Sequence, residues 1–228
     1  MRKIITSAFV SLDNVMQAPG GPEEDPTGGF KHGGWSTTLW DGEIEAAMGE
    51  LFSTPFDLVL GRKTYDIFAA HWPYVEKDPT ASSFDKLNAD IATMFNRITK
   101  YVATHSPDTL TWKNTEWLGK DVVAKLRDLK KGDGPMLLLQ GSSALIQQLL
   151  AADLIDEVRL LIYPLVLGKG KRFFGDGTLP AAFKLTTSKT SPSGVIITRY
   201  ERAGEVTTGS FGMETPTAAE LERRAKLT

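Results

Sequence analysis

Cysteine is absent from this 228-residue chain, which excludes disulfides, thiolate nucleophiles and thiolate metal sites. Histidine is scarce, and His32, His71 and His105 lack the short spacing of a zinc site, so we predict no bound metal. The formal net charge is only −2, which gives no electrostatic footprint for nucleic acid. No apolar run approaches the roughly 20 residues of a membrane-spanning helix. The opening residues 1–7 are too poor in apolar side chains for a signal peptide. We therefore expect a soluble cytoplasmic protein that binds neither nucleic acid nor membrane.

Several catalytic signatures are missing as well. Gly168 and Gly170 begin a segment that partly matches a dinucleotide-binding fingerprint, but Phe173 stands where the third glycine belongs. No Lys-Ser or Lys-Thr follows at the spacing of a phosphate-binding loop. No Gly-x-Ser-x-Gly elbow occurs, so hydrolase chemistry has no support. We expect residues 168–173 to form a structural turn.

Segments with strand and helix spacing alternate along the chain until a final hairpin. This order predicts an α/β fold with a mostly parallel sheet and an antiparallel edge. A Gly- and Pro-rich loop is expected over 18–34, and a polar linker with a short capped helix over 204–228. The domain itself is expected to span 1–203. The predicted strands are 4–10, 56–60, 100–104, 115–118, 135–139, 157–167 with an interruption at Pro164, 183–191 and 194–202, and the predicted helices are 41–52, 64–70, 84–98, 121–130 and 142–152.

The most informative segment is the short apolar run that ends at Gly61. Arg62, Lys63 and Thr64 follow at once, and the pattern then becomes helical. A strand that ends in glycine and leads into a helix presents free backbone N–H groups. Two cations and a hydroxyl beside them indicate a site for an anionic ligand such as a nucleotide phosphate. An ordinary strand-to-helix turn with solvated basic residues is the alternative.

Four segments together resemble the dihydrofolate reductase superfamily, and within it the RibD C-terminal branch of riboflavin biosynthesis. They are Ser11–Asn14, Gly61–Tyr65, Gln140–Leu145, and the pair Leu154–Leu160 with Pro164–Phe174. Their order along residues 2–203 carries the resemblance. It implies a dihydrofolate-reductase-like, three-layer α/β/α fold with a C-terminal antiparallel hairpin.

The resemblance also implies a nicotinamide cofactor. Arg62, Lys63 and Thr64, beside Gly61, would hold the phosphates. Thr104, His105 and Ser106 would surround the adenosine ribose and its 2′-phosphate, which favours NADPH over NADH because an NAD site prefers an acid there. The turn Gln140, Gly141, Ser142, Ser143 and Ala144 would bring a helix N-terminus against the diphosphate. Plain N-capping by Ser142 and Ser143 and a surface role for His105 are the alternatives. The nicotinamide would sit over the end of the first strand, near Ala8 and Val10.

Three carboxylates are candidates for a catalytic role. Asp13 either contacts substrate or fixes the loop that follows it. Glu45 falls, by spacing, where folate reductases carry their catalytic acid, and Trp40 falls where they carry a tryptophan. Glu157, with Asp156, would border the substrate pocket in the RibD branch, or form a surface charge pair.

We therefore expect an NADPH-dependent reductase similar to 5-amino-6-(5-phosphoribosylamino)uracil reductase, acting on a small heterocyclic or ribosyl-derived substrate. A dihydrofolate reductase and a non-catalytic nucleotide-binding module remain as alternatives. The last strands would leave an exposed sheet edge, and relatives in this branch pair there, so a homodimer is expected.

Overall fold

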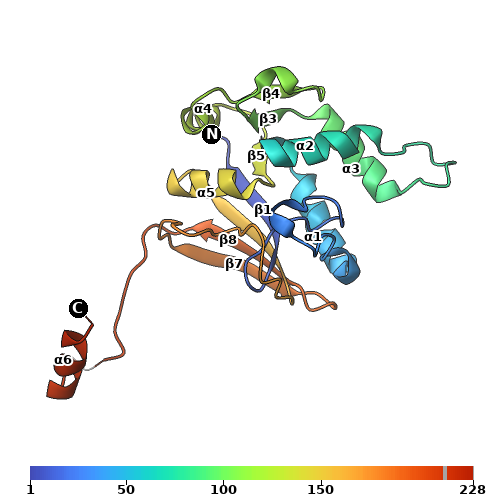
Figure 1. Cartoon of the computed structure of the whole chain (residues 1–228). Helices are drawn as coiled ribbons and strands as arrows, with labels where there is room; N and C mark the ends of the chain where they lie inside the picture. The colour runs from blue at the N-terminus through green and yellow to red at the C-terminus, as the bar shows by residue number, and fades with distance from the viewer. Residues whose placement is uncertain (213–214, 228) are drawn as a thin grey trace.

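The computed structural model describes residues 1–212 and 215–227. Eight strands form one sheet in the order β4-β3-β2-β5-β1-β6-β8-β7 (Figure 1). β1 to β6 run parallel, while β8 pairs antiparallel with both β6 and β7. The mostly parallel sheet with an antiparallel edge is thus confirmed. The strands span Ile4–Ser11 (β1), Phe56–Gly61 (β2), Lys100–Ala103 (β3), Thr115–Trp117 (β4), Met136–Leu139 (β5), Glu157–Tyr163 (β6), Phe183–Thr190 (β7) and Ile196–Arg202 (β8).

The predicted long strand over 157–167 is wrong in its second part. β6 ends at Tyr163, because Pro164 follows and has no N–H to donate to a strand ladder. The chain beyond it packs instead on the loop that follows β1. Leu12 N donates to Leu165 O at 2.8 Å, and Val15 forms an isolated bridge with Arg172. The loops after β1 and β6 therefore support each other at the carboxyl ends of these strands.

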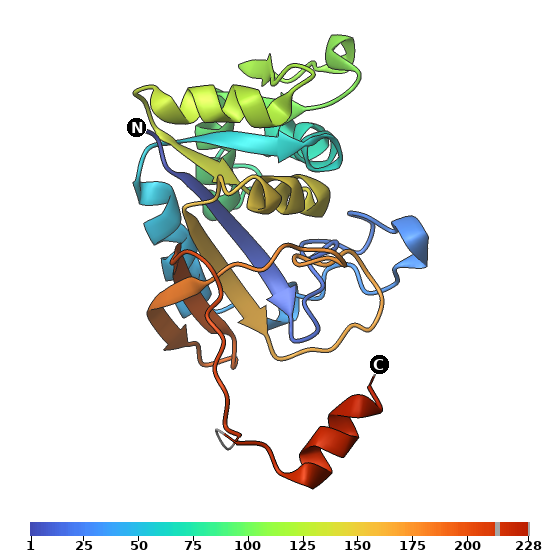
Figure 2. The ribbon, with the colours of Figure 1, turned by 90° about the vertical axis from the view of Figure 1, so that its left-hand side faces the viewer.

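Helices cover both faces of the sheet (Figure 2). α1 (Gly42–Ser53), α2 (Arg62–His71) and α3 (Lys86–Arg97) share one apolar cluster with β2, β3 and β5, which includes Leu51, Tyr65 and Phe95. α4 (Val122–Lys131) and α5 (Ser143–Ala151) share another with β1, β5 and β6, which includes Leu126 and Leu149. Each such buried side chain contributes about 1.5–3 kcal/mol to folding. Short 3₁₀ turns lie at Thr27–Gly29, Thr37–Leu39, Trp72–Tyr74 and Pro107–Thr109.

Lys100 in β3 is an unusual member of the interior, because its side chain is fully buried. Its ammonium donates to Phe95 O at 3.0 Å and lies 4.4 Å from the ring centre of Trp112. Burial lowers the pKa of Lys100 from 10.5 to about 8. The fold thus carries a buried cation that is compensated by a carbonyl and an aromatic face.

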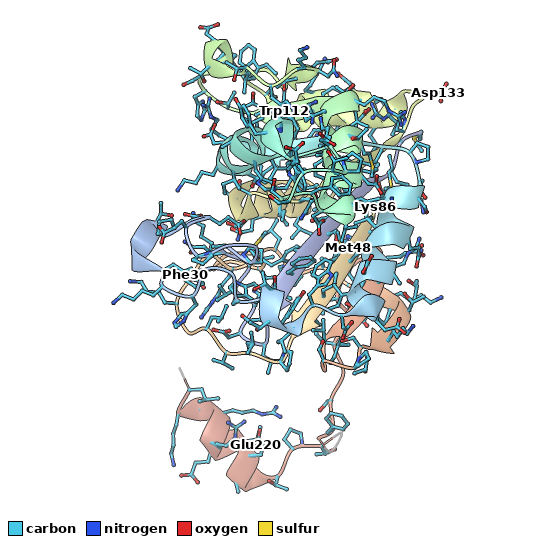
Figure 3. The ribbon with its side chains drawn as sticks, turned by 90° about the vertical axis from the view of Figure 1, so that its right-hand side faces the viewer. Phe30, Met48, Lys86, Trp112, Asp133 and Glu220 are labelled. Carbon is cyan, nitrogen blue, oxygen red and sulfur yellow. The ribbon has the colours of Figure 1, made fainter. Side chains whose placement is uncertain are left out.

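The C-terminal segment leaves the sheet after β8. Its helix α6 (Ala218–Ala225) begins at Thr217, whose hydroxyl accepts from Glu220 N at 3.3 Å, as the sequence predicts. This helix is labelled α6 in Figure 1 and marked by Glu220 in Figure 3, and in both views it lies apart from the sheet and its covering helices. Residues 213, 214 and 228 of the predicted tail lie outside the described ranges. None of the helices within those ranges has both the length and the apolar character needed to cross a bilayer.

Candidate functional site

The neighbouring strands β2 and β5 each lead directly into a helix at their carboxyl ends. Gly61 closes β2 and is the N-cap residue of α2, while Gln140 and Gly141 connect β5 to Ser142, the N-cap residue of α5. Gly61 N donates to Gly141 O at 2.9 Å. The starts of α2 and α5 are therefore in direct backbone contact.

Glycine is required on both sides of this contact. A Cβ on Gly61 would lie 2.9 Å from both the Cβ and the backbone N of Ser142. A Cβ on Gly141 would lie 2.6 Å from Thr64 Oγ1, and Gly141 has a φ of +136°, which L side chains rarely adopt. Any larger residue would push the two helix starts apart.

These two helices differ from the other helices in how they begin. α1, α3, α4 and α6 each have a side chain that accepts from first-turn N–H groups, namely Asp41, Asp85, Asp121 and Thr217. α2 begins at a glycine, and α5 begins at Ser142, whose hydroxyl makes no capping bond. The first-turn N–H groups of α2 and α5 are thus free of side-chain caps, which suits an anion.

A cavity of about 620 Å³ opens beside these uncapped helix starts. It runs along the carboxyl ends of β2, β3 and β5 to the start of α4. Predicted site residues that line it are Gly61, Arg62, Thr104, His105, Ser106, Ser142 and Ala144, and the further lining residues are Ala103, Thr109, Gly119, Lys120, Val122, Leu145 and Gln148.

The lining of the cavity contains cations and no carboxylate, although the whole chain is slightly acidic. Arg62, Lys120 and the imidazole of His105 line it, and the carboxylate that pairs with Arg62, Asp66, lies outside the lining. Within the described ranges no group of His, Asp and Glu side chains is arranged to hold a metal ion. The lining therefore suits a ligand with anionic groups at more than one point.

The three residues that follow Gly61 lie in three different environments. Arg62 lies over the loop after β3, where its guanidinium donates to Thr104 Oγ1 at 3.3 Å and Ser106 O at 3.2 Å. Its Nε also pairs with Asp66 at 2.8 Å. Lys63 is exposed and does not line the cavity, and Thr64 lies against Gly141. Arg62 is thus the cation of this segment that the structure brings to the cavity.

The end of β1 holds the next set of predicted residues. Ala8 and Val10 are buried in the cluster under α5 and do not line the cavity. Asp13 accepts from Ser11 Oγ at 2.6 Å, Leu167 N at 3.0 Å and Gly168 N at 2.7 Å.

Burial acts to raise the pKa of Asp13, but these hydrogen bonds outweigh it and hold the pKa below its usual value. Of the two roles considered for Asp13, the geometry corresponds to fixing a loop, because the carboxylate ties the chain after β1 to the chain after β6.

Glu45 is exposed on α1 and lines neither this cavity nor the smaller one described below. Trp40, just before α1, packs edge-on against Phe9 of β1 at 5.9 Å between ring centres. Trp35 is buried and donates to Gln17 O at 2.7 Å, so it belongs to the interior. The structure therefore brings Trp40, but not Glu45, against the sheet.

Glu157, which the resemblance places at the border of the substrate pocket, lies away from the larger cavity. It is the first residue of β6, paired in register with Ile5 at the amino end of β1, whereas the cavity lies at the carboxyl ends. Its carboxylate is almost fully buried between Arg159, at 2.6 Å, and Arg199, at 2.8 Å. Asp156 pairs with Lys130 at 2.6 Å. The acidic pair thus serves contacts within the fold, because an unpaired buried carboxylate would be costly.

Lys120 and Gln148 are cavity residues that sequence reasoning missed. Gly119 and Lys120 stand between β4 and the N-cap Asp121, which repeats the order of strand, glycine, cation and helix seen at Gly61 and Arg62. That repetition in the sequence could have identified Lys120 as a candidate cavity residue. Gln148 lies on α5 one turn beyond Ala144, and only the packing of α5 shows which of its faces borders the cavity.

The connections out of β1 and β5 leave the sheet in opposite directions. The chain passes from β1 through α1 toward β2, and from β5 through α5 toward β6 on the other face. In α/β proteins, ligands bind at the carboxyl ends of strands whose connections reverse in this way. Gln140 lies between β5 and the uncapped start of α5, and it does not line the larger cavity.

The chain is thus an α/β protein with a cavity at the carboxyl edge of its sheet, lined by cations and by no carboxylate. Residues 2–197 match the RibD C-terminal domain, and the chain belongs to that family. It is similar to the uncharacterized protein YyaP of Bacillus subtilis, with 26% identity over 208 residues that cover 89% of this chain and 96% of that protein.

Two solved structures share the fold. One is the diaminohydroxyphosphoribosylaminopyrimidine deaminase/5-amino-6-(5-phosphoribosylamino)uracil reductase of Thermotoga maritima, with a TM-score of 0.56 and 15% identity, covering 89% of this chain and 57% of that one. The other is dihydrofolate reductase from Enterococcus faecalis complexed with NADP(H), with a TM-score of 0.50 and 14% identity, covering 88% and 96%. The predicted dihydrofolate-reductase-like fold is confirmed, and the family supports a reductase-like role.

Proposed function

We propose that the protein is an NADPH-dependent reductase. The observation that carries the proposal is the pairing of two uncapped helix starts through Gly61 and Gly141, beside a cavity whose lining has cations and no acid. NADPH has two anionic regions, its diphosphate and the 2′-phosphate of its adenosine ribose. The uncapped helix starts fit the first, and Arg62 with Lys120 fits the second.

The diphosphate would be held by the first-turn N–H groups of α2 and α5 and by the hydroxyl of Ser142, which lines the cavity, whereas Thr64 and Ser143 do not line it. The 2′-phosphate would be held by Arg62, Lys120 and the loop Thr104–Ser106. An NAD site places an acid near the ribose hydroxyls, and no acid lines this cavity. The proposal therefore includes a preference for NADPH over NADH.

The cofactor would supply a hydride, and the chain would position its acceptor. We place that acceptor, a C=N or C=O carbon of a small heterocyclic or ribosyl-derived molecule, at the carboxyl ends of β1 and β5, where the connections of the sheet reverse. Asp13 would act there by holding the loops after β1 and β6 together rather than by touching substrate. Trp40 and Phe9 would offer flat apolar surface nearby. The nearest named activity is 5-amino-6-(5-phosphoribosylamino)uracil reductase.

The cofactor preference is tested by calorimetry with NADPH and NADH. Wild-type protein should bind NADPH more tightly, and Lys120→Ala should lose at least a factor of five in that preference. Lys125→Ala is the matched control, because Lys125 is exposed on α4 and does not line the cavity. Equal affinity for the two cofactors in the wild type would contradict the assignment.

Turnover is tested by following NADPH oxidation with dihydropterins, the pyrimidine intermediate of riboflavin synthesis and small carbonyl compounds. Reduction of the pyrimidine or a related compound is the expected result. Rapid dihydrofolate reduction that methotrexate inhibits would favour a dihydrofolate reductase instead. Tight NADPH binding without any turnover would favour a non-catalytic nucleotide-binding module.

A further inference from the structure

A second, smaller cavity lies away from the proposed cofactor site. Its volume is about 50 Å³, and it shares no lining residue with the larger cavity. It lies between α1 and the strands β1, β6, β8 and β7, and Arg159 and Leu161 from the middle of β6 line it. Met48 of α1, labelled in Figure 3, is one of its lining residues.

The charges at this cavity are unevenly paired. Arg159 and Arg199 both line it, and they share the single buried carboxylate of Glu157. Glu50 also lines the cavity and lies 4.0 Å from Arg159, but its side chain is 71% exposed, so solvent screens its charge. The side chains of Arg159, Arg199 and Glu157 are 17%, 32% and 1% exposed, so the less exposed part of the cluster has two cations and one carboxylate.

Arg199 also has an unused hydrogen-bond donor. Its Nε is buried and has no partner among the described residues. A buried N–H without an acceptor is costly, by about 1–3 kcal/mol, and such groups usually face a bound water or ion. The donor and the charge excess occur in the same guanidinium pair, and both would be satisfied by an anionic oxygen.

We propose that this cavity binds a small oxyanion, either a phosphate or a carboxylate group. Guanidinium groups present paired N–H donors that match the oxygens of both. Ser7 and Thr187 add hydroxyl-bearing side chains to the lining. The volume of about 50 Å³ is several times the roughly 10–15 Å³ that one water requires, so the cavity has room for a group larger than one water. This site is independent of the proposed reductase activity.

The test uses the full-length Arg62→Ala protein, in which phosphate binding at the larger cavity is weakened, and the cavity-filling variants described below separate the two sites. Sodium phosphate and, separately, sodium acetate are titrated at constant ionic strength maintained with sodium chloride. The readouts are the thermal unfolding midpoint and the heat of binding. We expect saturable stabilisation by at least one of the two anions, and the tighter one identifies the group that the site prefers.

A cavity-filling variant shows whether the anion binds at this position. Ala47→Leu projects from α1 into the cavity without removing any charge, and Ala46→Leu places the same side chain on the exposed face of α1. The apparent Kd should rise at least tenfold in Ala47→Leu and stay unchanged in Ala46→Leu. No saturable effect of either anion, or equal binding by the two variants, would overturn the proposal. NADPH binding is measured separately in wild-type protein, so failure here leaves the reductase proposal intact.

Discussion

Replacing Gly61 by alanine should damage ligand binding far more than its size suggests. Gly61 ends β2, begins α2 and donates its N–H to Gly141 at the start of α5. The new methyl would lie 2.9 Å from the Cβ and backbone N of Ser142 and closer still to its hydroxyl. These atoms belong to the start of α5 and cannot turn away as the end of a long side chain could.

The expected cost follows from that overlap. Inserting one carbon into a tightly packed contact destabilises a protein by about 1–3 kcal/mol. Part of this strain can be relieved by moving the start of α5 away from α2, which would separate the N–H groups proposed to bind the diphosphate. We therefore expect Gly61→Ala to weaken NADPH binding at least tenfold, which corresponds to about 1.4 kcal/mol.

Calorimetry with NADPH and urea unfolding measure the two effects on the same preparations. Gly49→Ala is the control, because Gly49 is exposed in the middle of α1 and an added Cβ meets nothing within 4 Å. That change should stabilise the protein by about 0.5–1 kcal/mol and leave NADPH binding unchanged. If Gly61→Ala kept wild-type affinity while unfolding more easily, the contact between α2 and α5 would be structural and the proposed diphosphate site would be wrong.

Three further predictions concern charge and assembly. Arg62→Ala should weaken NADPH binding by about 1.5–3 kcal/mol, whereas Lys63→Ala, at an exposed position outside the cavity, should have little effect by the same calorimetry; equal losses would contradict the structure. The pKa of Lys100 is about 8 in the folded protein and 10.5 for an unperturbed lysine, as in the unfolded chain. Between these two pH values the unfolded chain binds more protons than the folded protein, so the free energy of unfolding should rise with pH. Urea unfolding of Lys100→Met should show no such rise with pH and a stabilisation at pH 7 by on the order of 2 kcal/mol. If the free energy of unfolding of the variant rose with pH as in the wild type, Lys100 would not be the group responsible. Leu185 on β7 is 49% exposed at the sheet edge, so light scattering should show a homodimer at micromolar concentration that Leu185→Asp dissociates; a wild-type monomer would exclude this.

The fold was predictable because its periodic signals are strong and local. The buried run Phe56–Gly61 could only be an interior strand, and Asp121 with the cations at Lys130 and Lys131 defines both ends of α4. The end of β6 was harder to predict from the sequence. Apolar residues continue past Pro164, but Pro164 has no N–H to donate, so strand pairing ends at Tyr163. The apolar pattern that extended the predicted strand to Leu167 carries no information about hydrogen bonding.

The sequence predicted those residues of the candidate site that lie at or just after the carboxyl end of a strand. Gly61, Arg62, Thr104 and Ser142 follow the ends of β2, β3 and β5, and parallel strands bring such positions to one edge. Glu157 could not be placed in this way. It is the first residue of its strand, so it lies at the opposite edge, and its buried carboxylate pairs with Arg159 and with Arg199, which is 42 residues away in the sequence.

Helix capping explains why sequence identifies the start of α2 more clearly than that of α5. A glycine at the N-cap position has no side chain to satisfy the first-turn N–H groups, so the sequence itself shows that those groups at Gly61 are free for a ligand. Ser142 carries a hydroxyl that normally caps, and from sequence alone it indicates an ordinary helix start. The structure shows that the hydroxyl makes no capping bond, because close contact with Gly61 determines the position of Ser142. The functional character of the α5 start therefore comes from the approach of a second helix, which local sequence does not encode.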